Sequence, residues 1–302
     1  MYELIQAGPR TWYMECPARV GVWEMGEGRV CLIDAGSDRD AAKKLLRNLE
    51  AKGWKLDRVL NTHSHADHIG GNRLLQQRTG CAIYCPGVDW ALARFPVLEP
   101  AYLYGGRPGR PLRNKFLMAG ESEVQLLGPG SLPEGMELLE VPGHSFSQAA
   151  FKTPDGVWFL ADCLASAQTL EKYHVAVLHD PALSRESLHR VMELEGEVFV
   201  PAHAPAMGQA ALRALAQKNL EKMDEIEALL LALCAGGASF EQLIKGVFDH
   251  YGLTLDLSQY VLVGSTLRSY LAYLADEGRL EMRFADNRLC WHSVPVDAQR
   301  KP

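Results

Sequence analysis

Long uninterrupted apolar runs are missing from this 302-residue chain. The nearest approach, residues 226–238, is interrupted by Glu227 and by glycines. It therefore falls short of the roughly 18 to 20 apolar residues that a transmembrane helix needs. The first ten residues have no positively charged start followed by an apolar core, so we expect no secretory signal peptide. These absences predict a cytoplasmic protein that does not enter a membrane.

Regularly spaced cysteines and an excess of basic residues are absent as well. The seven cysteines are odd in number and show no repeated spacing, which predicts reduced thiols and no disulfide framework. Cys81 and Cys85 lack a second pair, so a zinc knuckle is not indicated. The net charge of −6 offers no overall attraction to nucleic acid or to an anionic membrane. A composition that is 47% hydrophobic can bury a large core, which fits a soluble enzyme.

One short stretch holds four side chains that can bind metal ions. Residues 61–71 read Asn-Thr-His-Ser-His-Ala-Asp-His-Ile-Gly-Gly and contain His63, His65, Asp67 and His68. The stretch follows a β-branched, apolar strand pattern and precedes a helix-like run. At such a junction neighbouring side chains can converge, whereas along a strand they alternate between the two faces. Imidazole and carboxylate suit zinc, iron and related divalent ions.

Four more candidate residues follow predicted strands elsewhere in the chain. They are Asp34 after an apolar run, His144 after a Pro-Gly turn, Asp162 after Val-Trp-Phe-Leu-Ala, and His203 after a β-branched run. The ends of strands are where α/β folds gather their chemistry. Because the same local context recurs, we expect these side chains to meet in one site.

This ordered set of residues resembles the metallo-β-lactamase superfamily over roughly residues 10–210. The chain departs from many relatives in two places. Asp162 lies in Leu-Ala-Asp-Cys, where many relatives have Gly-Asp-Thr, and His203 is flanked by alanines in place of glycine. We interpret the neighbouring Cys163 as a small buried hydrophobic side chain, with a thiolate close to the metals as the alternative.

The resemblance implies two adjoining metal sites. The implied ligands are His63, His65 and His144 for one ion, Asp67, His68 and His203 for the other, with Asp162 bridging and Asp34 steadying the loop from behind. The expected cofactors are two divalent ions, with zinc preferred and iron or manganese as alternatives. Two such ions about 4 Å apart can lower the pKa of a trapped water toward ~7, which yields a hydroxide nucleophile. Asp67 would orient that water, and it is the candidate catalytic residue.

Strand and helix patterns alternate through the first two thirds of the chain. Strands are predicted near 11–14, 19–24, 29–34, 58–61, 124–127 and 137–141, with helices over 38–52, 72–79 and 184–194. An Asp-Gly pair at Asp155 and Gly156 predicts a hairpin turn. Two sheet-and-helix halves packed face to face make an αββα sandwich, the α/β fold that the resemblance also implies.

The chain changes character after His203. Helices are predicted over 207–235, 239–248 and 265–277, followed by a two-stranded hairpin over 279–291. We therefore expect a catalytic domain over residues 1–207 and a small, mainly helical domain over 208–302 that resembles a winged helix.

Charge bears on the role of this second domain, because winged helices often bind nucleic acid. Residues 239–292 carry seven acids against five bases, so the segment lacks a basic face for phosphate. We favour packing, pocket capping or homodimer formation over nucleic-acid binding.

A basic segment rich in glycine and proline separates the ligand groups. Residues 100–115 contain no acid and carry the candidate substrate contacts Tyr102, Tyr104, Arg107, Arg110 and Arg113. Because arginine suits carboxylate and phosphate, the segment predicts a loop that covers an anionic substrate. A solvated surface loop or an oligomer contact is the alternative.

These features predict a dinuclear metal-dependent hydrolase that attacks a small anionic ester or thioester. The glutathione thioesters cleaved by related hydroxyacylglutathione hydrolases are examples that the resemblance implies. The alternatives are a single-strand RNA endonuclease of the same superfamily, an iron-dependent oxidoreductase such as a persulfide dioxygenase, and a silent binding module. The absence of an export signal argues against β-lactam cleavage.

Overall fold

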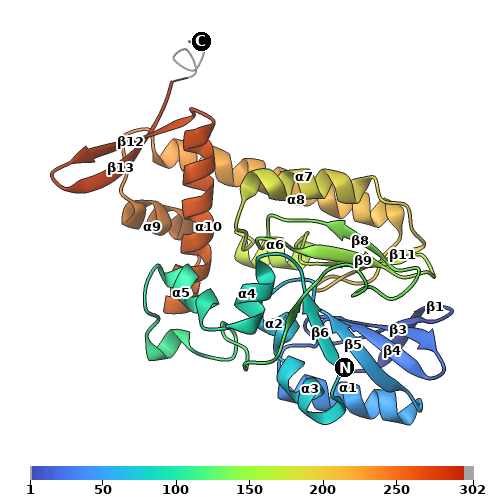
Figure 1. The fold of residues 1–302 in the computed structure, drawn as a ribbon. Helices are drawn as coiled ribbons and strands as arrows, with labels where there is room; N and C mark the ends of the chain where they lie inside the picture. Colours follow the sequence, from blue (N-terminus) through green and yellow to red (C-terminus); the bar gives the residue numbers. More distant parts are fainter. Residues whose placement is uncertain (1, 296–302) are drawn as a thin grey trace.

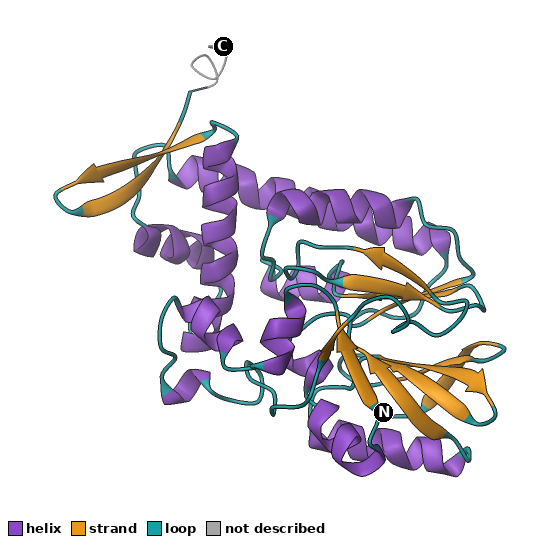
Figure 2. Ribbon diagram, in the orientation of Figure 1, coloured by secondary structure: helices purple, strands orange, loops and turns teal. Residues whose placement is uncertain are grey.

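Two β-sheets face each other in the centre of the protein, and helices cover the outer surface of each (Figure 1). The computed structural model describes residues 2–295. Figure 2 shows the strands of these two sheets in the middle of the layers, with helices on both sides and a separate hairpin apart from them. The αββα sandwich predicted from the sequence is therefore confirmed.

The first sheet has seven strands in sequence order. They are β1 (Leu4–Gly8), β2 (Thr11–Met14), β3 (Val20–Gly26), β4 (Arg29–Ile33), β5 (Lys55–Leu60), β6 (Ala82–Cys85) and β7 (Gln125–Leu126). Strands β1 to β4 pair in antiparallel fashion, whereas β4 to β7 run parallel. The carboxyl ends of β4 and β5 consequently meet at one edge.

The second sheet has four strands in the order β11-β10-β9-β8. They are β8 (Glu137–Glu140), β9 (Ala149–Lys152), β10 (Val157–Ala161) and β11 (Val198–Pro201). Strands β10 and β11 are parallel, so their carboxyl ends also lie together. The predicted turn at Asp155 and Gly156 joins β9 to β10, and Gly156 adopts the positive φ that such a turn needs.

Helices cover both sheets and fill the space beside them. They are α1 (Arg39–Ala51), α2 (Ala66–Ile69), α3 (Asn72–Thr79), α4 (Asp89–Arg94), α5 (Leu98–Tyr104), α6 (Ala167–Tyr173), α7 (Pro181–Met192), α8 (Gln209–Leu233), α9 (Phe240–Tyr251) and α10 (Leu257–Asp276). A short 3₁₀ turn spans Arg110–Leu112. No helix within residues 2–295 is both long and apolar enough to span a lipid bilayer.

Three layers of buried side chains hold the sandwich together. Leu45 of α1 and Leu75 of α3 pack on the outer face of the first sheet. Phe151 and Phe159 fill the space between the sheets. Each of these side chains is almost fully buried, and burying one stabilises the fold by roughly 1.5–3 kcal/mol.

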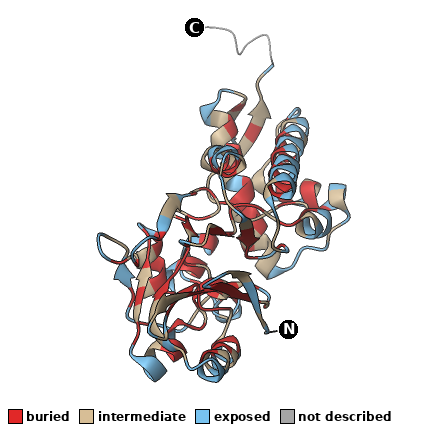
Figure 3. Cartoon of the chain, turned by 90° about the vertical axis from the view of Figure 1, so that its right-hand side faces the viewer, coloured by how far each residue is buried: buried red, intermediate tan, exposed pale blue. Residues whose placement is uncertain are grey.

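The third layer joins the second sheet to the carboxyl-terminal helices. Phe199 of β11 belongs to the same buried cluster as Leu212 of α8 and Leu267 of α10. Figure 3 shows buried segments continuing from the sandwich into this region. The domain boundary between residues 207 and 208 stays a prediction, and the hydrophobic core continues across it.

Several elements differ from the sequence expectation. Helices α4, α5 and α6 and strands β1 and β6 were not expected. The segment predicted as a loop begins inside α5, and Pro100 lies in the first turn of this helix, where its missing N–H costs no helical hydrogen bond. Helix α10 begins at Leu257, earlier than predicted, because the Asp256 carboxylate caps it by accepting from the Gln259 N–H.

The last two strands form the predicted hairpin. Strands β12 (Leu280–Ala285) and β13 (Arg288–Ser293) pair around Asp286 and Asn287, both of which have positive φ. That geometry is the two-residue turn that Asp and Asn tolerate. The carboxyl-terminal region therefore consists of helices followed by a hairpin, while its winged-helix character stays a prediction.

A buried carboxylate ties α7, α8 and the end of α10 together. Glu227 of α8 is 5% exposed and accepts from the guanidinium of Arg185 at 2.8 Å and from that of Arg279 at 2.6 Å. Because the three residues come from different elements, this network fixes how the helices sit against one another.

We expect Glu227→Ala to lower the free energy of unfolding by about 2–3 kcal/mol, since the partly buried Arg279 loses its carboxylate partner and Arg185 keeps only its pair with the exposed Asp224. Urea unfolding measures the change. Glu221→Ala on the exposed face of α8 is the control and should stay within about 0.5 kcal/mol of the parent. Equal losses for the two variants would contradict the importance of this network.

Candidate metal centre

All seven candidate ligands converge at one edge of the sandwich. His63, His65, Asp67 and His68 follow β5, His144 lies between β8 and β9, Asp162 follows β10, and His203 follows β11. Parallel neighbours bring these strand ends together, as the sequence analysis expected.

The ligand atoms form two adjoining groups. His63, His65 and His144 make one, and the other consists of Asp67, His68, Asp162 and His203. Within each group the candidate atoms lie within 4.8 Å of one another. The closest approach between two rings is 2.9 Å, from His144 Nε2 to His65 Nδ1.

The Asp162 carboxylate lies between the two groups. Its Oδ2 is 3.5 Å from His144 Nε2 in the first group and 3.3 Å from His203 Nε2 in the second. Its Oδ1 is 3.3 Å from His68 Nε2. A single carboxylate thus faces imidazoles of both groups.

Hydrogen bonds behind the loop orient two of its histidines. The Asp34 carboxylate accepts from His68 Nδ1 at 2.7 Å and from the Thr62 hydroxyl at 2.8 Å. Because the Thr62 hydroxyl donates its hydrogen bond to Asp34, its oxygen is free to accept a hydrogen bond from His63 Nδ1 at 3.0 Å. Both rings therefore hold a proton on Nδ1 and turn Nε2 toward the centre.

Backbone carbonyls orient two further histidines in the same way. His144 Nδ1 donates to the Val177 carbonyl at 2.8 Å, and His203 Nδ1 donates to the Pro17 carbonyl at 2.7 Å. Each ring is left with Nε2 directed at the cluster. His65 differs, because it turns its Nδ1 toward His144.

The carboxyl-terminal region braces one of these contacts. The Thr266 hydroxyl on α10 accepts from the Leu178 N–H at 3.1 Å and donates to the Leu178 carbonyl at 3.3 Å. Leu178 directly follows Val177, whose carbonyl holds His144. Helix α10 is therefore linked to the position of a candidate ligand.

Two glycines allow the loops to approach closely. A Cβ atom at Gly70 would lie 2.2 Å from the Ser37 carbonyl oxygen, and one at Gly71 would lie 2.2 Å from that of Ala35. Any side chain there would push the histidine-rich loop away from the segment that carries Asp34.

The donor set fits divalent metal ions. His63 Nε2, His68 Nε2 and Asp162 Oδ1 are buried and have no hydrogen-bond partner among the described residues. Buried polar atoms normally find partners, so three such atoms aimed at one another indicate a cation-binding centre. Neutral imidazoles with carboxylates are the ligands that zinc and iron take.

Opposite charges stabilise the ionised groups of the second cluster. The Asp162 carboxylate, helped by Asp67 and opposed by burial, raises the pKa of His203 to about 10. Burial would raise the pKa of Asp67, but His68 and the His203 hydrogen bond outweigh it and bring the pKa to about 2. In the first cluster, burial and His65 lower the pKa of His144 to about 4.

Sequence analysis missed a carboxylate that fastens the two ligand loops together. Asp89, at the start of α4, is fully buried. It accepts from the N–H and hydroxyl of Ser64, at 3.0 and 2.7 Å, and from Ser145 and Ser147 beyond His144, at 3.1 and 2.6 Å. No local motif marks this residue, because its partners are distant in the chain.

A second missed residue, Glu99 of α5, lies 3.9 Å from His65 Nε2. It is 6% exposed, and burial raises the pKa of its carboxyl well above the usual range. No sequence pattern marked Glu99, because α5 itself was not expected.

The basic segment contributes only partly to the surroundings of the cluster. Three cavities touch His144, and among residues 2–295 their walls include Tyr102 but not Tyr104, Arg107, Arg110 or Arg113. Tyr102 donates to His179 Nδ1 at 2.7 Å. The three arginines are exposed, and their role in substrate binding stays a prediction. Lys115, the last residue of the segment, and the next residue, Phe116, do line a cavity beside Asp67.

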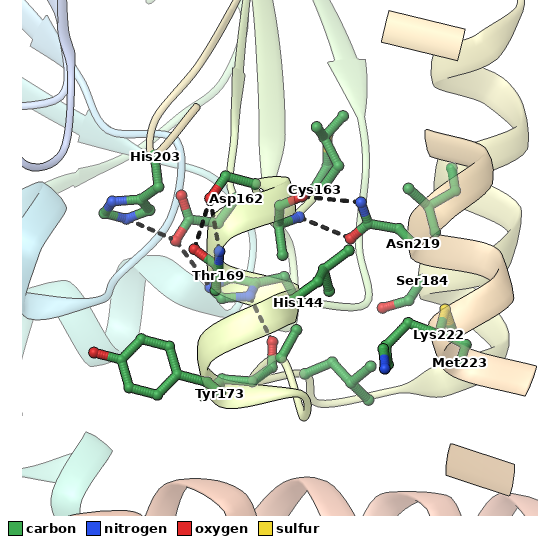
Figure 4. Close-up of a pocket in the computed structure, with 18 of the residues that line it drawn as sticks. His144, Asp162, Cys163, Thr169, Tyr173, Ser184, His203, Asn219, Lys222 and Met223 are labelled. Atoms are coloured by element: carbon green, nitrogen blue, oxygen red, sulfur yellow. Dashed lines mark hydrogen bonds and ion pairs between the residues drawn. The ribbon is translucent and has the colours of Figure 1, made fainter. Parts of the chain in front are cut away.

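Cys163 lies beside Asp162 on the wall of another cavity (Figure 4). It is buried, and this burial raises the pKa of the thiol far above neutral pH. The side chain is therefore a protonated thiol, in line with the interpretation as a small hydrophobic residue.

Comparison with known proteins agrees with this geometry. Residues 15–203 match the metallo-beta-lactamase superfamily, so the chain belongs to that family. A hydroxyacylglutathione hydrolase from Methylococcus capsulatus is 29% identical over 221 residues, which cover 68% of this chain and 71% of that protein. Another, from Hyphomonas neptunium, is 33% identical but aligns over 44% of this chain and only 42% of its own length.

A solved structure shows that the fold extends beyond the family match. A beta-lactamase domain protein from Burkholderia ambifaria superposes with a TM-score of 0.75 at 17% identity, covering 97% of this chain and 94% of that one. This similarity concerns the fold alone. It includes the carboxyl-terminal helices and hairpin, since the alignment covers almost the whole chain.

We expect Asp89→Asn to weaken metal binding by about 10–100-fold, because the two ligand loops lose a shared charged acceptor. Competition with a chelating dye measures the affinity. The matched control is Asp155→Asn, which alters a carboxylate that accepts from Arg10 and Thr11 far from the cluster. If both variants kept the parent affinity, Asp89 would have only a structural role.

Metal binding should release protons at neutral pH. His203, with a pKa of about 10, is protonated at pH 7 and must become neutral to bind a cation, whereas His144, with a pKa of about 4, is already neutral. The apparent affinity should therefore fall as the pH drops through neutrality, by about tenfold per pH unit for each proton displaced. Calorimetry in buffers of different ionisation enthalpy counts the protons, and no release at pH 7 would contradict this account.

Proposed function

We propose that this protein is a metal-dependent hydrolase that binds two divalent ions and cleaves small thioesters. The observation that carries the proposal is the pair of adjoining ligand groups with the Asp162 carboxylate between them. Family membership and the hydroxyacylglutathione hydrolase relatives support the hydrolase class and the thioester substrate. The proposed ligand assignment is that of the sequence analysis, with Asp162 bridging and zinc as the preferred metal.

When bound, the two ions would acidify the attacking water and polarise the attacked carbonyl. The protein residues hold the geometry for that step. Asp67 is ionised at neutral pH, with its Oδ2 3.1 Å from His203 Nε2, and it lines the cavity beside the cluster. Its carboxylate can accept a hydrogen bond from the water and so orient the oxygen toward the acyl carbon.

The bond changes follow from thioester chemistry. The water oxygen bonds to the acyl carbon, the carbon–sulfur bond breaks, and the thiol leaves with one proton of the water. The acid product keeps the water oxygen. Glu99 and the hydrogen-bonded Val177 carbonyl hold His65 and His144 during this exchange and so keep the cluster rigid.

The surroundings of the cluster favour a substrate with a polar half. Lys115, which pairs with Asp38 at 3.1 Å, lines a cavity of about 460 Å³ together with Asp67 and Glu99. An ammonium group at this position can bind an anionic or hydrogen-bonding group on the thiol. We propose that the thiol half of the substrate occupies this side and that the protein acts in the cytoplasm.

Metal content and a substrate panel test the proposal. We expect the protein, purified without added metal, to carry about two zinc ions per chain by elemental mass spectrometry. It should hydrolyse S-lactoylglutathione or another acyl thioester, and Asp67→Asn should lower kcat by at least about 100-fold, because the ionised carboxylate both orients the water and helps to hold the second ion.

Two outcomes would overturn this assignment. A content of one iron ion per chain would indicate a reaction of oxygen and sulfur in place of hydrolysis. Salt-sensitive binding and cleavage of single-stranded RNA, without thioester hydrolysis, would favour the endonuclease alternative.

A further inference from the structure

A second, largely apolar cavity opens from the same cluster on the other side. It has a volume of about 470 Å³, and His144, Asp162 and His203 form part of its wall. Figure 4 shows His203 and Asp162 at one side of this cavity, with Ser184 and Met223 at the other. The cavity therefore extends from the candidate metal centre into the space between the helices.

Aliphatic side chains from several elements line its interior. They include Leu164, Leu170, Leu178, Leu188, Met223 and Ile226. All six are buried, and they come from α6, α7, α8 and the adjoining loops. An enclosed surface of this kind binds apolar groups by removing them from water.

Two of the polar side chains on the wall have partners elsewhere, whereas the Tyr270 hydroxyl is buried with no hydrogen-bond partner among the described residues. Asn219 donates to the carbonyls of Ala165 and Leu215 and accepts from the Ala165 N–H. Lys222 pairs with Glu225 at 2.6 Å. Neither group needs a ligand to complete its hydrogen bonds, so neither opposes an apolar occupant.

The cluster thus lies where two unlike cavities meet. His144 and Asp162 line both of them. The first offers the charged side chains of Lys115, Asp38 and Glu99 beside apolar surface, whereas the second offers the aliphatic side chains together with polar groups such as the Tyr270 hydroxyl. A substrate cut at the cluster would place one half in each cavity.

We propose that the aliphatic cavity binds a medium-length, unbranched acyl chain, so that the preferred substrates are medium-chain acyl thioesters. The acyl carbon lies at the cluster, the alkyl chain extends between α6 and α8 toward Met223 and Ile226, and the polar thiol lies toward Lys115. This proposal rests on the proposed thioester hydrolysis. It sets the protein apart from an enzyme adapted to a small hydroxyacyl group such as lactoyl.

The first test compares acyl chains on one thiol. With glutathione thioesters from acetyl to octanoyl, kcat/KM should rise by about threefold for each methylene that enters the cavity. Octanoyl should exceed butyryl by at least tenfold, and lactoyl should be among the poorer substrates. A kcat/KM that is flat or falls with chain length would overturn the proposal, even if the thioesters are hydrolysed.

A cavity-filling variant tests the location of the chain. Met223→Trp should lower the ratio of octanoyl to acetyl activity by at least tenfold, because the indole occupies the space for the alkyl chain. Met282→Trp makes the same change on the exposed hairpin strand β12 and should leave the ratio unchanged. Equal ratios in the parent and both variants would overturn the assignment of the chain to this cavity.

A binding measurement separates this proposal from the hydrolase proposal. S-octylglutathione and S-methylglutathione are thioethers that cannot be hydrolysed, and calorimetry on the metal-loaded parent protein compares their affinities. At least tenfold tighter binding of the octyl compound supports the cavity assignment even where no thioester is cleaved. Equal affinities overturn it, whatever the hydrolytic activity.

Discussion

The constraint on which this structure depends is the burial of imidazole and carboxylate atoms that face one another without protein partners. In the interior, His68 Nε2 lies 3.3 Å from Asp162 Oδ1. These two atoms and His63 Nε2 have no hydrogen-bond partner among the described residues, which costs on the order of 1–3 kcal/mol for each atom. Such an arrangement persists only if the surrounding fold enforces it. Asp34 and Asp89 supply that enforcement by fixing the ligand loops with charged hydrogen bonds. The strand ends, Gly70 and Gly71, and the short helices all help to bring the ligand side chains together.

The sequence predicted those parts of the fold and site that depend on local patterns. The strands before His63 and Asp162 read as apolar runs, and α3 was predicted with its observed bounds because Gly80 ends it in a left-handed conformation. The residues that converge could be predicted because each directly follows a strand. Their spatial grouping followed from the order of parallel strands and from the family resemblance.

The remaining features depend on contacts between distant segments, which no local pattern encodes. Asp89 and Glu99 became visible only once α4 and α5 were placed against the ligand loops. The composition of the basic segment predicted that its arginines contact the substrate. In the structure these arginines face solvent, and Lys115 lines the cavity instead. The aliphatic cavity likewise arises from helices that are separate in sequence. In the sequence of each helix, the residues that line it cannot be told apart from ordinary core residues.

The link from Thr266 through Leu178 to the carbonyl behind His144 has a consequence for how the protein is made. Synthesis proceeds from the amino terminus, so the histidine-rich loop leaves the ribosome about 140 residues before His203 and about 200 before Thr266. Until α8 and α10 emerge, the second sheet lacks its outer cover and His144 lacks its brace. The early histidines are therefore made before the helix that braces His144, and the full set of contacts around the centre can form only after α10 has been synthesised.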